Sequence, residues 1–453
     1  MLKKKGRRIL KMKKLSKKQK LIGGIAILIV AVIVAIVITT SVIKNNNQVA
    51  SEGYSVATAN ASSSLISNYI LNGITIGGIT GKMEVLDTSD ATATAEDIVW
   101  GKTGYVNGEK ITGTYDNSTL AQLKRSGQTV TENTIVEDRY DNQIKVPEGF
   151  KIAEDSPVTI AEGVVIEDST AGDENTKGSQ FVWIPVGDIY TSADHTEENK
   201  VTITLGRYTF DSTAGEKYGK ATLVQSAENW EDTSSSVAIS TYYKELASST
   251  YGNEIAKNLE DFITKATTSH GYYIGRYEAG DATATNSART SSTIDTNPIV
   301  CKTGVYPYNW ITQPQASSLC QNMYSSDNFQ SDLINSYAWD TAIVFIQEFS
   351  GDTNYSQQRG RNTARALQKC GGSILDYNLD EGDVAQDIRC NIYDMAGNTW
   401  EWSTETCSYP HAPCVTRGGY YNNSTTDYTS VRGYGGTTNS GYGYGSCRPT
   451  LYL

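Results

Sequence analysis

The pattern of apolar and polar positions predicts a mixture of helices and short strands. Residues 255–266 repeat apolar side chains at helical spacing, which predicts a helix with one buried face. Two further helices are predicted, one over residues 315–324 and one that begins after Asn335, a residue type that favours the helix N-cap. The apolar run at 181–186 predicts a buried strand, and residues 272–278, which follow the first helix, predict another strand. Two main helices beside many short strands predict an α+β fold.

The chain before this globular region is predicted to be a stalk. Residues 44–90 are rich in Asn, Ser, Thr, Ala and Gly, a composition typical of a linker or tether. Residues 91–116 contain Asn107-Gly108 between strand-forming residues, which predicts a hairpin within a small β module. Residues 117–140 are predicted to be a second linker, and the folded domain to extend over 141–453.

The N-terminus combines a basic segment with a long apolar run. Residues 1–20 contain eleven Lys or Arg and no acidic residue, and residues 21–43 contain no charge. A helix of that length is roughly 34 Å long, enough to cross a bilayer. The pattern predicts a single-pass plasma-membrane protein with a cytoplasmic N-terminus and an extracellular C-terminal domain. A cleaved signal peptide is the alternative, although its apolar core is usually shorter.

The charge of the remaining chain excludes one class of partner. The 39 basic residues minus those eleven leave 28, against 50 acidic residues, so the net charge after residue 20 is −22. A strongly acidic domain repels phosphate backbones, and we therefore expect no nucleic-acid partner.

All seven cysteines lie between Cys301 and Cys447. Outside the cell they could form up to three disulfides, whose connectivity the sequence does not reveal. Cys407 and Cys414 flank a Pro-containing loop and are the first pair to expect. Free thiols are the alternative if the surroundings are not oxidising.

Several ordered motifs resemble one family. Residues 392–402 read Ile-Tyr-Asp-Met-Ala-Gly-Asn-Thr-Trp-Glu-Trp, and residues 417–421 read Arg-Gly-Gly-Tyr-Tyr. With the segments 181–185, 272–278 and 333–342, these blocks resemble the sulfatase-modifying-factor family, whose prototype is the formylglycine-generating enzyme. The resemblance covers residues 141–453 and implies a C-type-lectin-like fold.

The resemblance also implies a calcium site. Carried over position by position, its ligands would be the side chains of Asp394 and Glu401 and the carbonyls of Gly397 and Thr399. Hard oxygen ligands around a tight Gly turn suit calcium. The alternative is that this loop only packs its tryptophans into the core.

The catalytic chemistry of the prototype is not expected here. Its two copper-binding cysteines correspond to Asn423 and Tyr428 in this chain, so no copper is expected. A formylglycine-generating-type oxidoreductase acting on a protein cysteine is therefore an alternative function only.

Residues 418–446 have the composition of a binding surface. They consist mostly of Gly, Tyr, Thr, Ser and Asn, and tyrosine offers a large contact area with few torsions to freeze. We expect this segment to recognise an extracellular protein or glycan. Its composition is also that of segments varied by diversity-generating retroelements in some proteins of this fold, but Gly, Tyr and small polar residues fill loop-rich relatives that never vary, so both interpretations stay open. A structural surface or appendage subunit is the other alternative. The candidate ligand-binding residues are Tyr420, Tyr421, Asn423, Tyr428, Arg432, Tyr434, Asn439, Tyr442 and Tyr444.

Overall fold

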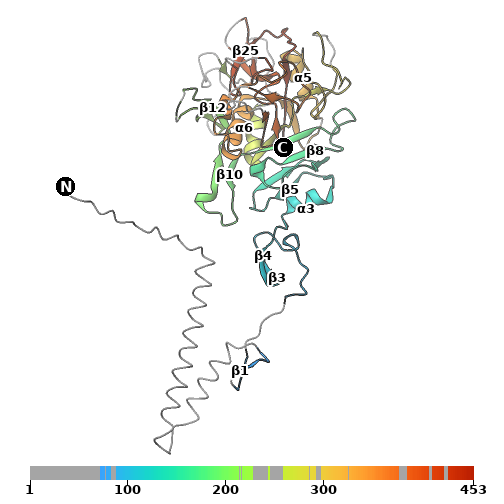
Figure 1. Cartoon of the computed structure of the whole chain (residues 1–453). Coiled ribbons are helices and arrows are strands. Elements are labelled where there is room, and N and C mark those ends of the chain that lie inside the picture. The colour runs from blue at the N-terminus through green and yellow to red at the C-terminus, as the bar shows by residue number, and fades with distance from the viewer. Residues whose placement is uncertain are drawn as a thin grey trace, which may run out of the picture. The chain divides into compact units, whose positions relative to one another are not determined.

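The structure is a computed structural model (Figure 1). It describes residues 72–76, 78–82, 88–213, 215, 217–227, 243–244, 259–284, 286–291, 297–324, 326–376, 385–407, 411–422 and 427–453. The described residues up to Thr92, with Tyr105–Glu109, belong to one unit, and Ala93–Gly104 with Lys110–Leu453 to a second. Strands predominate over helices in the described residues, which confirms the α+β class.

The predicted hairpin at Asn107-Gly108 is confirmed. Both residues have a positive φ, 51° and 78°, as a two-residue type I′ turn requires. The backbone N–H of Asn107 donates to the Thr88 carbonyl over 3.0 Å, and that of Gly108 to the Thr88 hydroxyl over 2.8 Å. The short strands of this region form two pairs, β1 (Thr75–Ile76) with β2 (Ile79–Thr80) and β3 (Thr103–Val106) with β4 (Glu109–Thr112).

A six-stranded antiparallel sheet forms the centre of the second unit. The predicted buried strands are its middle strands, paired so that Trp183 lies opposite Tyr273. Nearly every side chain of these two strands is buried because helices and loops cover both faces of the sheet. The order is β18 (Gln330–Leu333), β27 (Pro449–Tyr452), β15 (Gly271–Gly275), β9 (Gln180–Pro185), β8 (Val165–Asp168) and β7 (Phe150–Ile152).

Two helices lie on one face of this sheet and a third on the other. Helices α4 (Leu259–Thr268) and α6 (Ser336–Phe349) share one apolar cluster with Tyr272 of β15. Helix α5 (Gln313–Gln321) belongs to the cluster on the opposite face. The predicted cap of α6 is confirmed, because the Asn335 side chain accepts a 2.9 Å hydrogen bond from the backbone N–H of Ala338.

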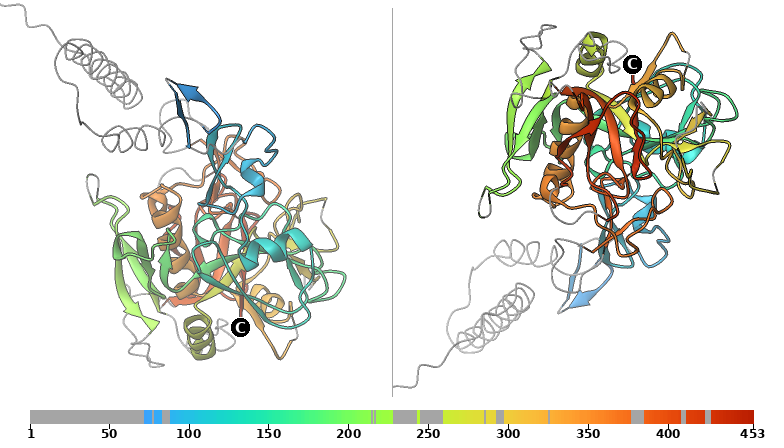
Figure 2. Two further views of the ribbon diagram at one scale, coloured as in Figure 1. Left: turned by 90° about the horizontal axis from the view of Figure 1, so that it is seen from below. Right: turned by 90° about the horizontal axis from the view of Figure 1, so that it is seen from above.

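A second sheet holds the C-terminal motifs. In the right-hand view of Figure 2 the C-terminal strands, drawn in red, lie in the middle of this unit beside the orange helix α6. Trp400 lies opposite Gly445 in a parallel pairing, whereas the neighbouring pairings of this sheet are antiparallel. The order is β14 (Tyr243–Lys244), β23 (Trp400–Cys407), β24 (Cys414–Arg417) and β25 (Arg432–Gly436), with β26 (Gly445–Cys447) beside β23.

Small strand pairs surround the two sheets. They are β5 (Thr134–Glu137) with β6 (Gln143–Val146), β10 (Gly187–Tyr190) with β11 (Lys200–Ile203), β12 (Gly206–Phe210) with β13 (Ala221–Ser226), β16 (Gly280–Asp281) with β17 (Ile299–Val300), β19 (Ile374–Leu375) with β20 (Ala385–Gln386), and β21 (Ile388–Arg389) with β22 (Ile392–Tyr393).

The segment expected to be a linker, residues 117–140, is folded. It contains helix α3 (Thr119–Ser126) and strand β5, and the Ser118 side chain caps the helix. Leu120 and Val136 are buried in the main apolar cluster. The sequence analysis overlooked this short amphipathic helix because its polar residues outnumber its apolar ones.

The prediction of a transmembrane chain is overturned for the part that the structure describes. Among the described helices, α6 is the longest with 14 residues, or about 21 Å, and none is long and apolar enough to cross a bilayer. The predicted span, residues 21–43, lies outside the described residues.

The expected pairing of Cys407 with Cys414 is also corrected. None of the seven cysteines forms a disulfide in this structure. Cys414 lies opposite Thr406 in the β23–β24 pairing, so the next residue, Cys407, points to the other face of the sheet. The two sulfur atoms are therefore directed apart.

Candidate functional site

Four of the predicted ligand-binding residues come together in an aromatic cluster. The cluster consists of Trp400 and Trp402 at the start of β23, Tyr420 and Tyr421 after β24, and Tyr442 and Tyr444 before β26. The parallel pairing of β26 with β23 brings them together, and the backbone N–H of Trp400 donates to the Tyr444 carbonyl over 2.8 Å.

The tyrosine rings of the cluster stack on one another. The centroids of Tyr442 and Tyr444 are 5.4 Å apart with an interplanar angle of 8°, and those of Tyr444 and Tyr420 are 4.7 Å apart at 28°. The Trp400 ring stands at 87° to Tyr444, with 5.1 Å between centroids. All four tyrosines and Trp400 are half-buried, whereas Trp402 is fully buried. Stacked rings cover part of one another's faces, so we expect the stack to present mainly ring edges and hydroxyl groups.

Polar side chains border the cluster. The indole N–H of Trp400 donates to Asp427 over 2.8 Å. The Arg359 guanidinium lies 4.9 Å from the Tyr428 ring centroid and donates to its hydroxyl over 3.0 Å. Partial burial, and then the Asp427 carboxylate, raise the pKa of Tyr420, so its hydroxyl stays a hydrogen-bond donor at neutral pH.

The other predicted residues of the segment are placed as follows. Asn439 is exposed in a turn, in which its backbone N–H donates to the Thr437 hydroxyl over 3.4 Å. Tyr434 lies in β25, and its backbone pairs with that of Val415 in β24. The side chain of Tyr434 is outside the described part. Asn423 also lies outside the described residues.

Arg432 lies in a buried ionic network rather than in the aromatic cluster. Its side chain is 7% exposed and contacts Asp340 of α6 and Glu405 of β23, the latter over 2.8 Å. Arg207 reaches Glu405 over 2.7 Å, and Arg417 reaches Asp340 over 2.6 Å. Three guanidinium groups thus face two carboxylates, and the ionic network holds β12, β23, β24 and β25 against α6.

The excess of positive charge in this network keeps the Glu405 carboxylate ionised. Burial alone would raise the pKa of Glu405, but Arg432, Arg207 and Arg417 together hold it below its ordinary value. Glu405 is therefore ionised at neutral pH.

Three of the residues predicted to bind calcium, Asp394, Gly397 and Thr399, lie in the segment that leads into β23, and the fourth, Glu401, lies in β23 itself. Asp394 is fully buried, and its Oδ2 accepts a 2.6 Å hydrogen bond from the backbone N–H of Gly371. Its Oδ1 has no hydrogen-bond partner in the described part of the chain. Burial, and then the nearby Asp387 carboxylate, raise the pKa of Asp394. The Gly397 carbonyl accepts from the backbone N–H of Thr399 over 2.8 Å.

The side chain of Glu401 is engaged elsewhere. The Arg448 guanidinium donates to both of its oxygens, over 2.6 and 2.9 Å. A calcium ion needs six to eight oxygen ligands, and a bidentate guanidinium takes the place of such a cation. Among the described residues, no group of three or more His, Cys, Asp or Glu side chains could hold a metal. This arrangement does not fit a calcium site through Glu401.

The residue that holds this loop is not among the predicted site residues. Glu278, just after β15, accepts from the Asn398 side chain over 2.7 Å and from the backbone N–H of Thr399 over 3.1 Å. It is fully buried. An acidic residue at the end of the predicted strand 272–278 was the available signal, because a buried carboxylate has to find donors.

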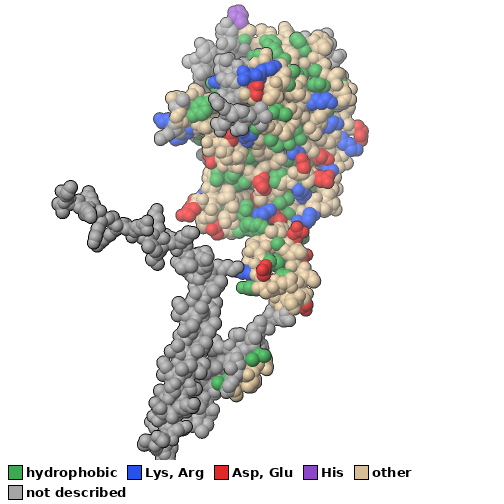
Figure 3. Space-filling view, viewed as in Figure 1, with side chains coloured by type: hydrophobic (Ala, Val, Ile, Leu, Met, Phe, Trp, Pro, Cys, Tyr) green, Lys and Arg blue, Asp and Glu red, His purple; other side chains and the backbone are tan. Residues whose placement is uncertain are grey.

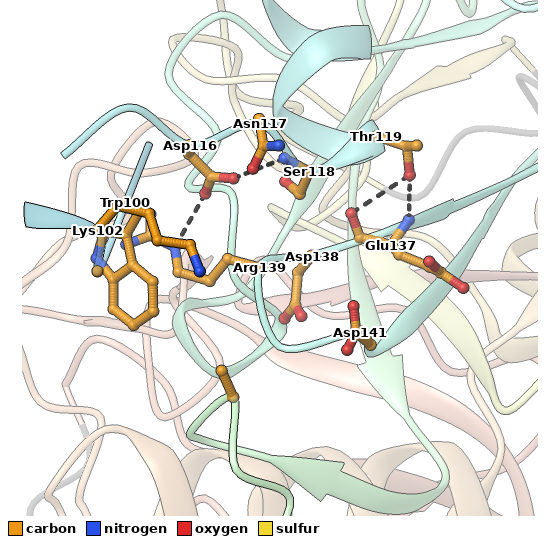
Figure 4. Close-up of a pocket in the computed structure, with 12 residues that line it drawn as sticks. Trp100, Lys102, Asp116, Asn117, Ser118, Thr119, Glu137, Asp138, Arg139 and Asp141 are labelled. Carbon is orange, nitrogen blue, oxygen red and sulfur yellow. Dashed lines mark hydrogen bonds and ion pairs between the residues drawn. The ribbon is translucent and has the colours of Figure 1, made fainter. Parts of the chain in front are cut away.

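A separate pocket of about 540 Å³ lies beside helix α3 (Figure 4). Arg139 pairs with Asp116 over 2.9 Å and lies 5.3 Å from the Trp100 ring centroid. Asp138 accepts from three backbone N–H groups, and Asp141 pairs with His195 over 3.4 Å. These charged groups already hold one another and the neighbouring loops, so the pocket offers a ligand few free partners.

Comparison of the chain with models of protein families, with curated proteins and with solved structures gave no match. The resemblance to the sulfatase-modifying-factor family therefore stays an expectation. On the face drawn in Figure 3, charges of both signs are interspersed over the second unit, without a region of one sign. The feature that stands out chemically is the aromatic cluster, a half-buried group of rings with hydroxyl donors at its edge.

Proposed function

We propose that this chain is a binding protein that recognises a protein ligand through the aromatic cluster. The stacking of Tyr442, Tyr444 and Tyr420 carries this proposal, because half-buried aromatic side chains held in fixed positions are what binding hot spots are made of. Since the rings are already packed together, little conformational entropy is lost when a ligand covers them.

The arrangement of the rings favours a protein over a glycan. A sugar ring packs flat on an open aromatic face, whereas the Tyr444 ring is stacked with two other rings, at 8° to Tyr442 and at 28° to Tyr420. What the stack offers instead is edges, hydroxyl groups and the neighbouring Asp427 carboxylate, which suit the mixed polar and apolar surface of a protein.

We further propose that residues 141–453 form a C-type-lectin-like domain of the sulfatase-modifying-factor type. The ordered motifs support this, since 181–185 and 272–278 supply the paired strands β9 and β15. The segments 333–342 and 392–402 supply the start of α6 and the entry to β23, as conserved core elements of one domain would.

The experiment is a binding screen with matched variants. The full chain is tested against a panel of cell-surface proteins and against a glycan array, and each positive is repeated with Tyr444→Ala, Tyr444→Phe and Tyr105→Ala. Tyr105 is a suitable control because it is 63% exposed and belongs to the hairpin of β3 and β4. Loss of a hot-spot side chain costs about 2 kcal/mol, or roughly 30-fold in Kd.

We expect a protein ligand whose binding weakens with Tyr444→Ala and is retained with Tyr105→Ala. Tyr444→Phe keeps the ring stack and loses only the hydroxyl, so it separates packing from hydrogen bonding. A ligand found only among glycans would contradict the choice of ligand class. Binding that is indifferent to Tyr444→Ala would overturn the proposed site.

A further inference from the structure

Two cysteines distant in the sequence touch in the core. The Sγ atoms of Cys320, in α5, and Cys447, in β26, are 4.0 Å apart, and both residues are fully buried in the main apolar cluster. The residues are 127 positions apart in the chain.

Several of the other described thiols are directed to oxygen atoms. Cys301 donates to the Tyr277 carbonyl over 3.6 Å, and Cys370 to the Glu278 carbonyl over 3.4 Å. Cys414 lies 3.9 Å from the amide oxygen of Gln313. Sulfur faces sulfur at the Cys320–Cys447 contact, where each thiol lies in apolar surroundings and can gain a bond by oxidation.

The distance between the two sulfur atoms suits a disulfide. A disulfide bond is about 2.05 Å long, so the two sulfur atoms have to approach by about 2 Å. Rotation about the Cα–Cβ bonds of two short side chains can shorten the distance between their sulfur atoms by that amount. The elements that carry them are both anchored, since β26 pairs with β23 and the Gln313 side chain of α5 donates to the Ser403 carbonyl of β23 over 3.2 Å.

We propose that Cys320 and Cys447 are an oxidation site and form a disulfide by exchange with a small-molecule disulfide such as oxidised glutathione. One protein thiolate attacks the glutathione disulfide, which releases one glutathione thiolate. The second protein thiolate then attacks the mixed disulfide at the protein sulfur and releases the second glutathione. Two protein thiols are oxidised, one glutathione disulfide is reduced, and the two protons leave on the two glutathione thiols.

Burial controls the rate of this reaction. Burial raises the pKa of the Cys320 thiol, and the neighbouring Cys447 adds to the effect, so the reactive thiolate is scarce in the closed fold. Exchange therefore proceeds when the core opens, and it is fastest under mildly destabilising conditions.

The bond would tie α5 to the strand that follows the aromatic cluster. Gly445, the first residue of β26, comes directly after Tyr444, and the Tyr442 carbonyl accepts from the backbone N–H of Trp310, shortly before α5, over 2.8 Å. A covalent link between Cys320 and Cys447 closes a long loop, which restricts the unfolded chain and raises the stability of the folded one.

The test is a mapping of the bond in the full chain. The protein is incubated with oxidised glutathione at a urea concentration just below its unfolding transition, until the number of free thiols no longer changes. Free thiols are then blocked with N-ethylmaleimide under denaturing conditions, and the peptides are identified by mass spectrometry. We expect a cross-linked pair of peptides in which neither Cys320 nor Cys447 carries N-ethylmaleimide. We also expect the midpoint of urea unfolding to rise on oxidation and to fall again when dithiothreitol reduces the bond.

Variants separate the bond from other effects. Cys447→Ala should abolish both the cross-link and the effect of dithiothreitol on the midpoint, whereas Cys370→Ala should leave both in place. Full labelling of Cys320 and Cys447 in the wild type, or a cross-link that joins either of them to another cysteine, overturns the proposal. The readout does not involve ligand binding, so its failure is distinct from failure of the proposed function.

Discussion

The composition of the buried ionic network predicts which of its charged side chains can be neutralised with the smaller loss of stability. Arg207, Arg417 and Arg432 face Asp340 and Glu405, and the side chains are between 0% and 7% exposed. Arg432→Gln would leave two guanidiniums with two carboxylates. Glu405→Gln would leave three guanidiniums with one carboxylate in a site that water does not reach. The two changes each remove one charge, yet they push the balance of the network in opposite directions.

The contacts indicate the magnitudes. Glu405 contacts three guanidiniums, over 2.7, 2.8 and 3.3 Å, and removal of one partner from a buried ion pair costs about 3–5 kcal/mol. We expect Glu405→Gln to reach or exceed that range. Arg432→Gln loses its hydrogen bonds to Asp340 and Glu405 but also removes the excess positive charge, so we expect a loss of about 1–3 kcal/mol.

The assay is urea unfolding of the full chain followed by tryptophan fluorescence, with free energies from linear extrapolation. The pH dependence adds a second readout. Because the folded-state pKa of Glu405 lies below its unfolded value of about 4.3, its contribution is fully present above that pH. It is lost as the pH falls through the lower folded pKa. The difference in stability between wild type and Glu405→Gln should therefore be constant near neutral pH and shrink below about pH 4.

Two results would refute the reasoning. If Arg432→Gln leaves the free energy of unfolding unchanged and removes ligand binding, Arg432 belongs to the binding surface, as the sequence analysis expected. If Glu405→Gln costs less than Arg432→Gln, the excess of positive charge is not what makes Glu405 necessary.

Three further predictions concern the helix cap, calcium and the variability of the C-terminal segment. Asn335→Ala should lower the free energy of unfolding by about 1 kcal/mol in the same urea assay, while Asn335→Asp, which keeps a capping oxygen, should change it little. The melting temperature should be the same in calcium chloride and in a chelator, because Arg448 occupies both oxygens of Glu401, and a rise with calcium would restore the predicted metal site. Deep sequencing of the 3′ end of the gene across its source population decides whether the segment varies. Substitutions confined to codons 420–446 at template adenines would mean a diversified receptor, whereas an invariant segment would leave a fixed binding surface or a structural domain.

Local chemistry along the chain determined the elements that the sequence analysis predicted correctly. The Asn107-Gly108 turn depends on two adjacent residues that tolerate a positive φ. The cap of α6 depends on the side chain of Asn335 and the backbone N–H of Ala338, three residues further along the chain. The buried strand at 181–186 was visible as a continuous apolar run, and β15 as the strand-forming residues Tyr272, Tyr273 and Ile274. Each of these features involves neighbours in sequence, so the sequence alone contains the information.

Contacts between distant segments were decided by the tertiary structure alone. Arg432 looked like part of a binding surface because its neighbours in sequence are Gly, Tyr and Ser, yet α6 and β23 bring two carboxylates to it. Glu401 matched a calcium ligand by position, but Arg448 lies beside it because β26 pairs in parallel with β23. The same pairing gathers Tyr442, Tyr444 and Trp400 into one cluster. Residues far apart in the chain meet only when the whole core has packed, and no local pattern records which of them will be neighbours.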